Sequence, residues 1–300
     1  MRVFVTGANG FVGSAVVREL IGAGHQVLGL ARSDAAARSV AAAGAEVHRG
    51  DVQDLDSLRR GATAADGVIH TAFIHDFTGD FKAACETDRR AIETLGGVLA
   101  GSRRPLIITS GTGLLAPGRL GREQDPQPSG PDAFPRVASE EAADAVASRG
   151  VRVAVMRLPP SVHGEGDHGF VPLLIDLARK KAAAAYIGDG VNRWPAVHRI
   201  DAARLYRLVL DSEFAPGARF HGVAEEGVPF RQIAEVIGRR LGVPVVRKSR
   251  DEAAEHFGWF GHFAALDAPA SSQRTREQLA WRPEQPGLIA DLDQPAYFKT

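Results

Sequence analysis

Thr6-Gly7-Ala8-Asn9-Gly10-Phe11-Val12-Gly13 stands directly after Arg2-Val3-Phe4-Val5, a short apolar run that is typical of a β-strand. From Val12 to Ile21 the apolar residues recur at helical spacing, so the glycines fall where a strand turns into a helix. Gly7 would allow the tight turn, Gly10 would let the backbone approach a pyrophosphate, and Gly13 would let the helix lie close to the sheet. The pyrophosphate would meet free N–H groups and the positive end of the helix dipole. The stretch therefore predicts a dinucleotide-binding turn.

Strand-like and helix-like segments alternate through the first half of the chain. Further strands are predicted at residues 26–30, 45–48, 67–72, 105–110 and 151–156, and helices at 34–43, 55–62, 81–101 and 137–147. This alternation predicts a doubly wound parallel α/β sheet of the Rossmann type, with the ligand site at the carboxyl ends of the strands. Beyond residue 157 the alternation weakens. We therefore expect a dinucleotide-binding domain over 1–156 and mainly a smaller, discontinuous substrate cap over 157–300, with the chain near 190–225 returning to the first domain.

Composition limits the classes of partner and compartment. Lys plus Arg and Asp plus Glu both number 36, so no bulk charge favours a nucleic acid or an anionic membrane as partner. Cys85 is the only cysteine, which excludes an internal disulfide and fits a reducing compartment. The first strand begins at Arg2, and no apolar run is long enough to span a bilayer. We expect a cytoplasmic protein with a small-molecule substrate.

Several segments together resemble the extended short-chain dehydrogenase/reductases, the epimerase/dehydratase-like members of that superfamily. They are the glycine turn, Asp51, His70-Thr71-Ala72, Arg157-Leu158-Pro159-Pro160-Ser161-Val162-His163-Gly164, Ile187-Gly188-Asp189-Gly190 and Val197-His198-Arg199-Ile200-Asp201-Ala202-Ala203. The resemblance implies that Asp51 and Val52 flank the adenine, although Asp51 could instead be a helix N-cap. It also implies that Thr71-Ala72-Phe73 runs beside the cofactor and that Pro159-Pro160-Ser161 lies by the nicotinamide.

Arg32 bears on which cofactor binds. An NAD site usually places a carboxylate at the end of the second strand, where it accepts from the ribose hydroxyls and would repel a 2′-phosphate. This chain offers the Arg32 guanidinium, with the Ser33 hydroxyl beside it, and a guanidinium can pair with phosphate oxygens. The sequence favours NADP(H) over NAD(H). Two alternatives stay open: Asp34 could reach the ribose after a small backbone shift, and Arg32 could be a solvated surface charge.

The predicted cofactor-binding residues are Gly7, Asn9, Gly10, Phe11, Val12, Gly13, Arg32, Ser33, Asp51, Val52, Thr71, Ala72, Phe73, Pro159, Pro160 and Ser161.

At the catalytic position the chain departs from the family pattern. Members carry a Tyr followed four residues later by a Lys; the Tyr donates a proton, and the Lys lowers its pKa and holds the nicotinamide ribose. The corresponding place in this chain is Phe134-Pro135-Arg136-Val137-Ala138, which lacks both groups. The Ser or Thr partner of that pair survives as Ser110 or Thr112, although either hydroxyl could equally satisfy the end of the strand.

Four explanations of the missing pair stay open. Another side chain donates the proton, His75 first, with Tyr186, His163 and His198 as alternatives, although a lone His is more often structural. The substrate is already polarised for hydride, as an iminium or an activated alkene is. Phe134 was introduced in place of the Tyr in order to trap a complex of the enzyme with its ligand. The chain is a nucleotide sensor without catalysis.

The predicted substrate pocket consists of Phe134, His163, Tyr186, Trp194 and His198. Trp194 could instead pack as core between the two parts. The cap shows no arginine-rich clamp, which argues against nucleotide-sugars and favours a small apolar substrate. No metal is expected, since cofactor approach already explains the glycines around His163 and His168.

The function predicted from the sequence is an NADP(H)-dependent oxidoreductase that reduces a carbonyl or an imine, with Ser110 or Thr112 polarising the acceptor atom. An epimerase or dehydratase with a tightly held cofactor is one alternative, and a non-catalytic redox sensor is another. The resemblance implies a homodimer, because the family commonly pairs the two helices predicted here at 81–101 and 137–147.

Overall fold

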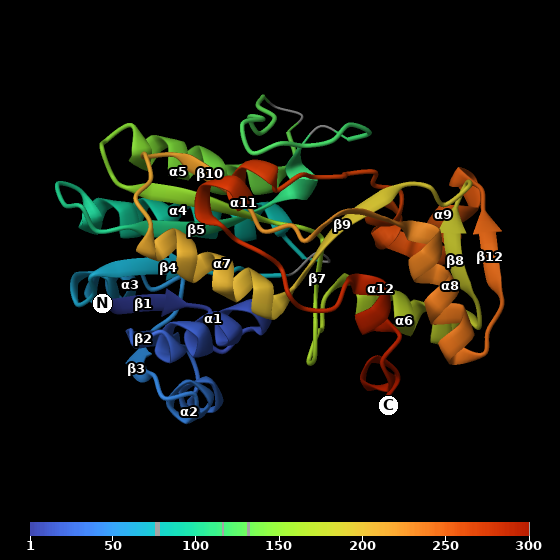
Figure 1. The fold of residues 1–300 in the computed structure, drawn as a ribbon, viewed down its shortest axis with the longest axis horizontal. Helices are drawn as coiled ribbons and strands as arrows, with labels where there is room; N and C mark the ends of the chain where they lie inside the picture. Colours follow the sequence, from blue (N-terminus) through green and yellow to red (C-terminus); the bar gives the residue numbers. More distant parts are fainter. Residues whose placement is uncertain (76–78, 116, 131–132, 300) are drawn as a thin grey trace.

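A seven-stranded sheet forms the centre of the larger part of the molecule (Figure 1). The computed structural model describes residues 1–75, 79–115, 117–130 and 133–299, and in it the neighbouring strands of this sheet run parallel. The strand order is β10-β6-β5-β4-β1-β2-β3. The strands are β1 Arg2–Thr6, β2 Gln26–Ala31, β3 Glu46–Arg49, β4 Gly67–His70, β5 Leu106–Gly111, β6 Val153–Leu158 and β10 Ala218–His221. The predicted doubly wound sheet is confirmed, and its strand order reverses between β1 and β4, where such sheets bind ligands.

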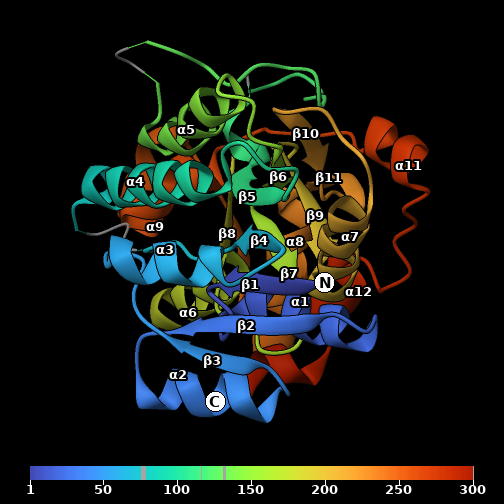
Figure 2. The same ribbon diagram turned by 90° about the vertical axis from the view of Figure 1, so that its left-hand side faces the viewer.

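Helices cover both faces of this sheet (Figure 2). On one face lie α1 Phe11–Gly22, α2 Asp34–Ala42 and α7 Arg199–Asp211; on the other lie α3 Leu55–Thr63, α4 Phe81–Leu99 and α5 Ala138–Ala147. Side chains alternate along each strand, so Val3 and Val5 of β1 join the first core and Phe4 joins the second. Both faces of the sheet are therefore buried, as a parallel sheet requires.

Polar side chains begin several of these helices. Ser33 accepts from the Ala36 N–H at the start of α2, and Asp54 and Asp80 cap α3 and α4 in the same way. A side-chain cap satisfies one of the N–H groups that a helix start leaves without a partner. The start of α1 is different, because its N-cap residue is Gly10 and makes no side-chain bond.

The smaller part of the molecule has its own core. A three-stranded sheet joins β7 Ser161–His163, β9 Arg193–His198 and β11 Glu225–Pro229, and a two-stranded sheet joins β8 Ala184–Ile187 and β12 Val245–Lys248. The helices around them are α6 Phe170–Lys181, α8 Phe230–Leu241, α9 Arg250–Phe257, α10 Gly261–Ala264 and α12 Leu288–Leu292. Trp194, Phe230 and Phe260 are almost fully buried at the centre of this cap.

The second half of the chain crosses between the two parts. Helix α7 packs on α1, β10 pairs with β6, and Trp281, just after α11 Gln273–Leu279, joins the core of the large sheet. The Trp281 Nε1–H donates to Asp201 O of α7. The cap is therefore tied to the large sheet at several points along the chain. Within the described part of the chain, no helix combines the length and the hydropathy that a membrane span needs.

A fully buried ion pair fastens α5 to the sheet. Arg157 of β6 binds Glu140 through two bonds of 2.8 and 2.7 Å, and Ser110 donates to the same carboxylate. Burial alone would raise the pKa of Glu140, but the bonds and the charge of Arg157 hold it below its ordinary value. On the other side, His221 Nε2 lies 3.4 Å from the Arg157 guanidinium, and Nδ1 lies 2.7 Å from Ser271 O.

His221 should make the stability of the protein depend on pH. Because Ser271 O only accepts, Nδ1 carries the proton of the neutral ring and Nε2 faces Arg157 as an acceptor. Burial, and also the Arg157 charge, lower the pKa of His221 from 6.5 to about 4. The stabilisation that the neutral His221 ring contributes is therefore complete above the pKa that this side chain has in the unfolded chain, and it is lost as the pH falls toward 4. We expect the free energy of unfolding, from guanidinium titrations, to fall over this range, by at most about 1.4 kcal/mol per pH unit for this group. The decline should be smaller in His221→Asn, and identical profiles would contradict the assignment.

Candidate functional site

The glycine turn is pressed against the end of β4. Gly7 has a φ of +68°, and its N-terminal neighbour Thr6 ends β1. A Cβ at Gly7 would stand 2.8 Å from Ala72 N, and a Cβ at Gly13 would stand 2.0 Å from Gly7 O. The Gly10 N–H donates to Gly7 O at 2.8 Å, which closes the turn. Gly7 and Gly13 thus stand where no side chain fits, which lets the turn, the start of α1 and the end of β4 pack together.

The first turn of α1 can hold a pyrophosphate. Gly10 makes no side-chain cap bond, so the leading N–H groups of α1 have no capping partner from it. Together with the helix dipole they form a site for an anion. Phe11 lies beside this end of the helix, under the guanidinium of Arg199 at 4.5 Å. The arrangement fits the phosphates of a dinucleotide, with Asn9 and Val12 next to the binding glycines.

The ends of β2 and β3 place the residues predicted for the adenosine half. Arg32 is exposed, and the Ser33 hydroxyl accepts from Ala36 N at the start of α2. Asp34 is paired at 2.5 Å with Arg49 of β3, so its charge is drawn to that guanidinium. Asp51 accepts from Gln53 N in a tight turn. Asp54, three residues farther on, is the residue that caps α3, and Val52 packs on the core.

Ser110 and Thr112 differ in what their hydroxyls do. Ser110 Oγ donates to the buried carboxylate of Glu140 at 2.8 Å. Thr112, in the 3₁₀ turn η1 Thr112–Leu114, is 1% exposed, and its Oγ1 has no hydrogen-bond partner among the described residues. A buried hydroxyl without a partner is costly unless something else satisfies it. Thr112 is therefore the one of these two hydroxyls that the described residues leave without a partner.

An aromatic wall follows the end of β4. Its rings are those of Phe73, Phe81, Phe134, His262 and Phe263. Phe81 lies 5.9 Å from Phe73 and 5.3 Å from Phe134, and the His262 ring lies nearly parallel to Phe134 at 6.5 Å. Phe134 is 38% exposed. His262 and Phe263 belong to an aromatic cluster of the sequence that suits either the interior of the cap or the roof of the pocket. Phe81 was not predicted as a site residue, because it comes from α4, far from Phe134 in sequence.

His75 stands beside the aromatic wall, with its ring 5.0 Å from that of Phe73. Much of its surface reaches solvent. Even so, desolvation by nearby protein groups, and then the charge of Arg136, lower the pKa of His75 from its ordinary value. A lowered pKa makes the protonated ring a stronger acid but a less populated one at neutral pH.

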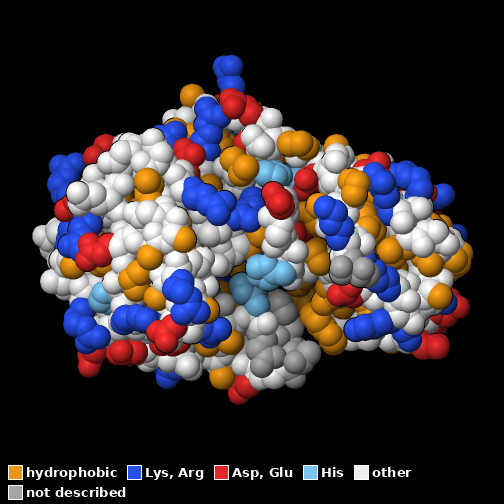
Figure 3. Space-filling model, turned by 90° about the horizontal axis from the view of Figure 1, so that it is seen from below, with side chains coloured by type: hydrophobic (Ala, Val, Ile, Leu, Met, Phe, Trp, Pro, Cys, Tyr) orange, Lys and Arg blue, Asp and Glu red, His pale blue; other side chains and the backbone are white. Residues whose placement is uncertain are grey.

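A second cluster lies where β7 and β9 meet the C-terminal segment. His163 Nδ1 lies 2.9 Å from Asp291, which also accepts from the Tyr297 hydroxyl, and the His198 ring packs edge-on against His163. His163 Nε2 and Ser161 Oγ are buried without partners among the described residues. Burial, first of all, and the His163 charge lower the pKa of His198. Pro159 and Pro160 lead into this cluster, and Figure 3 shows histidines gathered between the two parts of the molecule.

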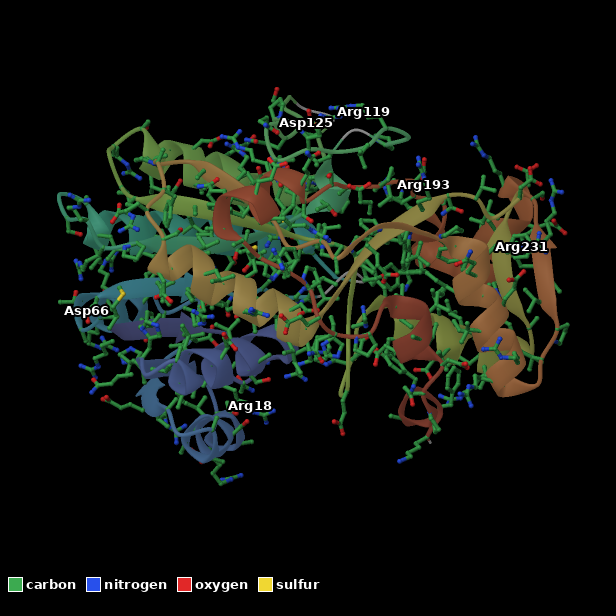
Figure 4. All side chains as sticks on the ribbon, viewed as in Figure 1. Arg18, Asp66, Arg119, Asp125, Arg193 and Arg231 are labelled. Atoms are coloured by element: carbon green, nitrogen blue, oxygen red, sulfur yellow. The ribbon has the colours of Figure 1, made fainter. Side chains whose placement is uncertain are left out.

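Two predicted pocket residues lie elsewhere in the cap. Trp194 is fully buried, and its Nε1–H donates to Phe263 O. Tyr186 of β8 lies under the guanidinium of Arg231, at the end of the cap remote from the large sheet (Figure 4). The structure therefore places neither with the glycine turn. Among residues 1–75, 79–115, 117–130 and 133–299, no three His, Cys, Asp or Glu side chains converge as metal ligands would.

Arg136 is a site residue that the sequence reasoning missed. Its guanidinium lies 4.1 Å from the centre of the Phe73 ring and binds Asp88, Ser139 and Thr109 O. Ala138, in contrast, is buried in the first turn of α5. The guanidinium of Arg136 thus lies at the edge of the sheet, close to the segment around Phe134. No sequence pattern predicted that Asp88 of α4 would accept its hydrogen bond.

Comparisons with known proteins give a family by profile and a fold by structural similarity. The profile of the NAD dependent epimerase/dehydratase family matches residues 3–220. The chain is 50% identical over 299 residues to an uncharacterized protein of Schizosaccharomyces pombe, covering 99% of this chain and 100% of that one. It is 28% identical over 265 residues to the 2-alkyl-3-oxoalkanoate reductase of Stenotrophomonas maltophilia, covering 83% and 78% of the two chains. The solved dTDP-glucose 4,6-dehydratase of Streptomyces venezuelae, with NAD bound, matches with a TM-score of 0.78 at 22% identity, covering 99% and 97%.

Gly13→Ala should damage the turn. The added methyl group would meet Gly7 O at 2.0 Å and Thr71 Oγ1 at 2.8 Å, so the helix or the turn has to move. We expect NADPH binding, followed by fluorescence titration, to weaken about tenfold or more, and stability to fall by about 1–3 kcal/mol. Gly22→Ala is the control on the same helix, because nothing lies within 4 Å of its Cβ. It should bind normally and gain up to about 1 kcal/mol. Unchanged affinity in Gly13→Ala would show that the close approach does not matter for binding.

Proposed function

The chain belongs to the NAD-dependent epimerase/dehydratase family, and on this premise we propose that it is an NADP(H)-dependent oxidoreductase. Its substrate is a small, largely apolar ketone, aldehyde or imine. The cofactor held at the glycine turn would supply a hydride to the carbonyl or imine carbon, and His75, beside the aromatic wall, is the first candidate for the proton that completes the alcohol or amine. The observation that carries the proposal is the aromatic wall that follows the end of β4.

The charges around the aromatic wall support a neutral substrate. Arg136 stacks on Phe73, but its charge is balanced by Asp88 at 2.9 Å. A nucleotide-sugar would bring a diphosphate and would need cations to bind it. Arginines of the cap are instead held in ion pairs with carboxylates: Arg193 with Asp267, Arg231 with Glu235, Arg239 and Arg240 with Asp293, and Arg247 with Asp189. A reductase acting on an alkyl oxo-acid among the relatives agrees with this choice of reaction.

NADP(H) is the proposed cofactor. Arg32 is exposed at the end of β2, and the competing carboxylate of Asp34 is paired with Arg49. The 2′-phosphate would meet Arg32 and Ser33, since a guanidinium binds phosphate oxygens through charge-assisted bonds. The solved dehydratase of the family holds NAD, so the preference is a property we propose for this chain.

Arg32→Ala should weaken NADPH binding by about tenfold to a hundredfold, which corresponds to the loss of one charge-assisted pair. NADH binding should stay unchanged, because NADH has no 2′-phosphate. Fluorescence titration with both reduced cofactors measures this. Arg103→Ala, an exposed arginine at the amino-terminal side of β5, is the control and should alter neither affinity. Equal affinity of the unchanged protein for NADPH and NADH would overturn the preference.

Oxidation of NADPH with ketones, aldehydes and cyclic imines tests the reaction, and Thr112→Val tests the group that polarises the acceptor atom. Because the Thr112 hydroxyl is buried and unpartnered, its removal should leave the free energy of unfolding unchanged or raised. Turnover should fall by about 10²-fold, the usual cost of losing one oxyanion donor.

Thr112→Ser, which keeps the hydroxyl, should retain most of the turnover. A drop in stability with normal turnover would make Thr112 structural. Interconversion of substrates without net NADPH oxidation would indicate an epimerase or dehydratase, and no turnover on any class would indicate a redox sensor.

We also propose a homodimer in the cytoplasm, formed through α4 and α5. The two helices are joined into one surface by the Arg89–Glu141 ion pair. Gel filtration at two concentrations distinguishes a dimer from a monomer.

A further inference from the structure

A chain of hydrogen bonds runs from the glycine turn to Arg136. Thr6 Oγ1, one residue before Gly7, accepts from Ala72 N at 3.3 Å and lies 2.7 Å from His70 Nδ1. His70 Nε2 lies 2.9 Å from Asp88 Oδ1, and Asp88 Oδ2 accepts from Arg136 at 2.9 Å. His70 and Asp88 are almost completely buried. Side chains from β1, β4 and α4 and from the segment before α5 thus meet at one edge of the sheet.

The hydrogen bonds of this chain are centred on the carboxylate of Asp88. Burial alone would raise the pKa of Asp88, but Arg136, His70 and Ser139 hold it below the ordinary value, so the carboxylate is charged. A carboxylate only accepts, so His70 donates from Nε2, while its Nδ1 shares a hydrogen bond with the Thr6 hydroxyl. The buried groups satisfy one another and hold Arg136 in one direction.

Topology assigns Arg136 to one half of the cofactor. The pyrophosphate site lies at the carboxyl end of β1, and the residues for the adenosine half follow β2 and β3. The nicotinamide half then extends to the other side of β1, over β4 and β5, which lie next to each other in Figure 2. Arg136 binds Thr109 O of β5 and stacks on Phe73, just after β4. Its side chain is 14% exposed, and its bonds to described residues occupy three of the five N–H groups of a guanidinium.

We propose that Arg136 is the cation that binds the ribose of the nicotinamide half, in place of the lysine absent at Ala138, and that Asp88 and His70 are its positioning residues. The ribose hydroxyl oxygens accept from the guanidinium N–H groups. The proposal rests on the proposed function only for the identity of the cofactor. Arg136 thus stands at one end of the hydrogen-bond chain that begins at Thr6, beside the glycine turn.

Two ligands that share the adenosine half test this role. NADPH carries the nicotinamide ribose, whereas 2′,5′-ADP lacks it. Arg136→Met should weaken NADPH binding about tenfold or more, as expected for the loss of a hydrogen bond from a charged donor, and leave 2′,5′-ADP binding unchanged. Asp88→Asn should weaken NADPH selectively as well, because Arg136 then loses its charged anchor. If the chain proves to prefer NAD(H), NADH and 5′-ADP form the corresponding pair.

Arg89→Met is the matched control, since Arg89 is a half-buried arginine of α4 paired with Glu141. It should leave both affinities as they are. Should Arg136→Met not fold, Arg136→Lys keeps the charge beside Asp88, and the ratio of its NADPH and 2′,5′-ADP affinities decides. A selective loss of NADPH binding supports the proposal. Equal losses for the two ligands, or no loss for either, overturn it.

This readout is independent of turnover. If no ketone, aldehyde or imine is reduced, the proposed reaction fails while the ratio of affinities still tests Arg136. If NADPH is oxidised normally by Arg136→Met and bound as tightly as by the unchanged protein, the reaction stands and the role of Arg136 falls.

Discussion

The close approach of the glycine turn to the end of β4 is the constraint on which the site depends. No side chain fits at Gly13, whose Cβ would stand 2.0 Å from Gly7 O, nor at Gly7, which faces the backbone of Ala72. Because the turn can come this near, the start of α1 points its uncapped N–H groups along the strand edge. Thr6, one residue before the turn, stands opposite His70 in the β1–β4 pairing and lies within hydrogen-bond distance of it. The glycine turn and the polar network therefore begin at the same strand end.

Buried charge holds the segment around Phe134 in place. Two ion pairs fasten it: Arg136 with Asp88 before α5, and Glu140 of α5 with Arg157 of β6. A buried pair is weak evidence for extra stability, but removal of one partner leaves an uncompensated charge and is strongly destabilising. The pairs thus specify one arrangement of this segment. In it, Arg136 reaches the strand edge, Ala138 turns into the core and Phe134 stays partly exposed within the aromatic wall.

Local patterns predicted the large sheet well and the cap poorly. Within the cap, regular apolar spacing agrees with the helices at 170–181 and 230–241. The run from Lys180 to Ala185 has the composition of a helix end at the surface. The helix does end at Lys181, but Ala184 and Ala185 are buried in β8, where they pair with β12. Alanine does not favour a strand, and β12, the strand that pairs with β8, lies some sixty residues later in the sequence.

The glycine spacing and the alternation of strand and helix were enough to predict the fold class, which the structure confirms, because both depend on neighbours along the chain. That position 134 carries a Phe and position 138 an Ala is also plain from the sequence alone. The aromatic wall, the Thr112 hydroxyl without a partner among the described residues and the path from Thr6 to Arg136 are not. They join residues from separate strands and helices, and no local pattern records which side chains meet when the sheet closes. The tertiary structure therefore determines which side chains meet at this site, whereas local sequence patterns determine the strands and helices that carry them.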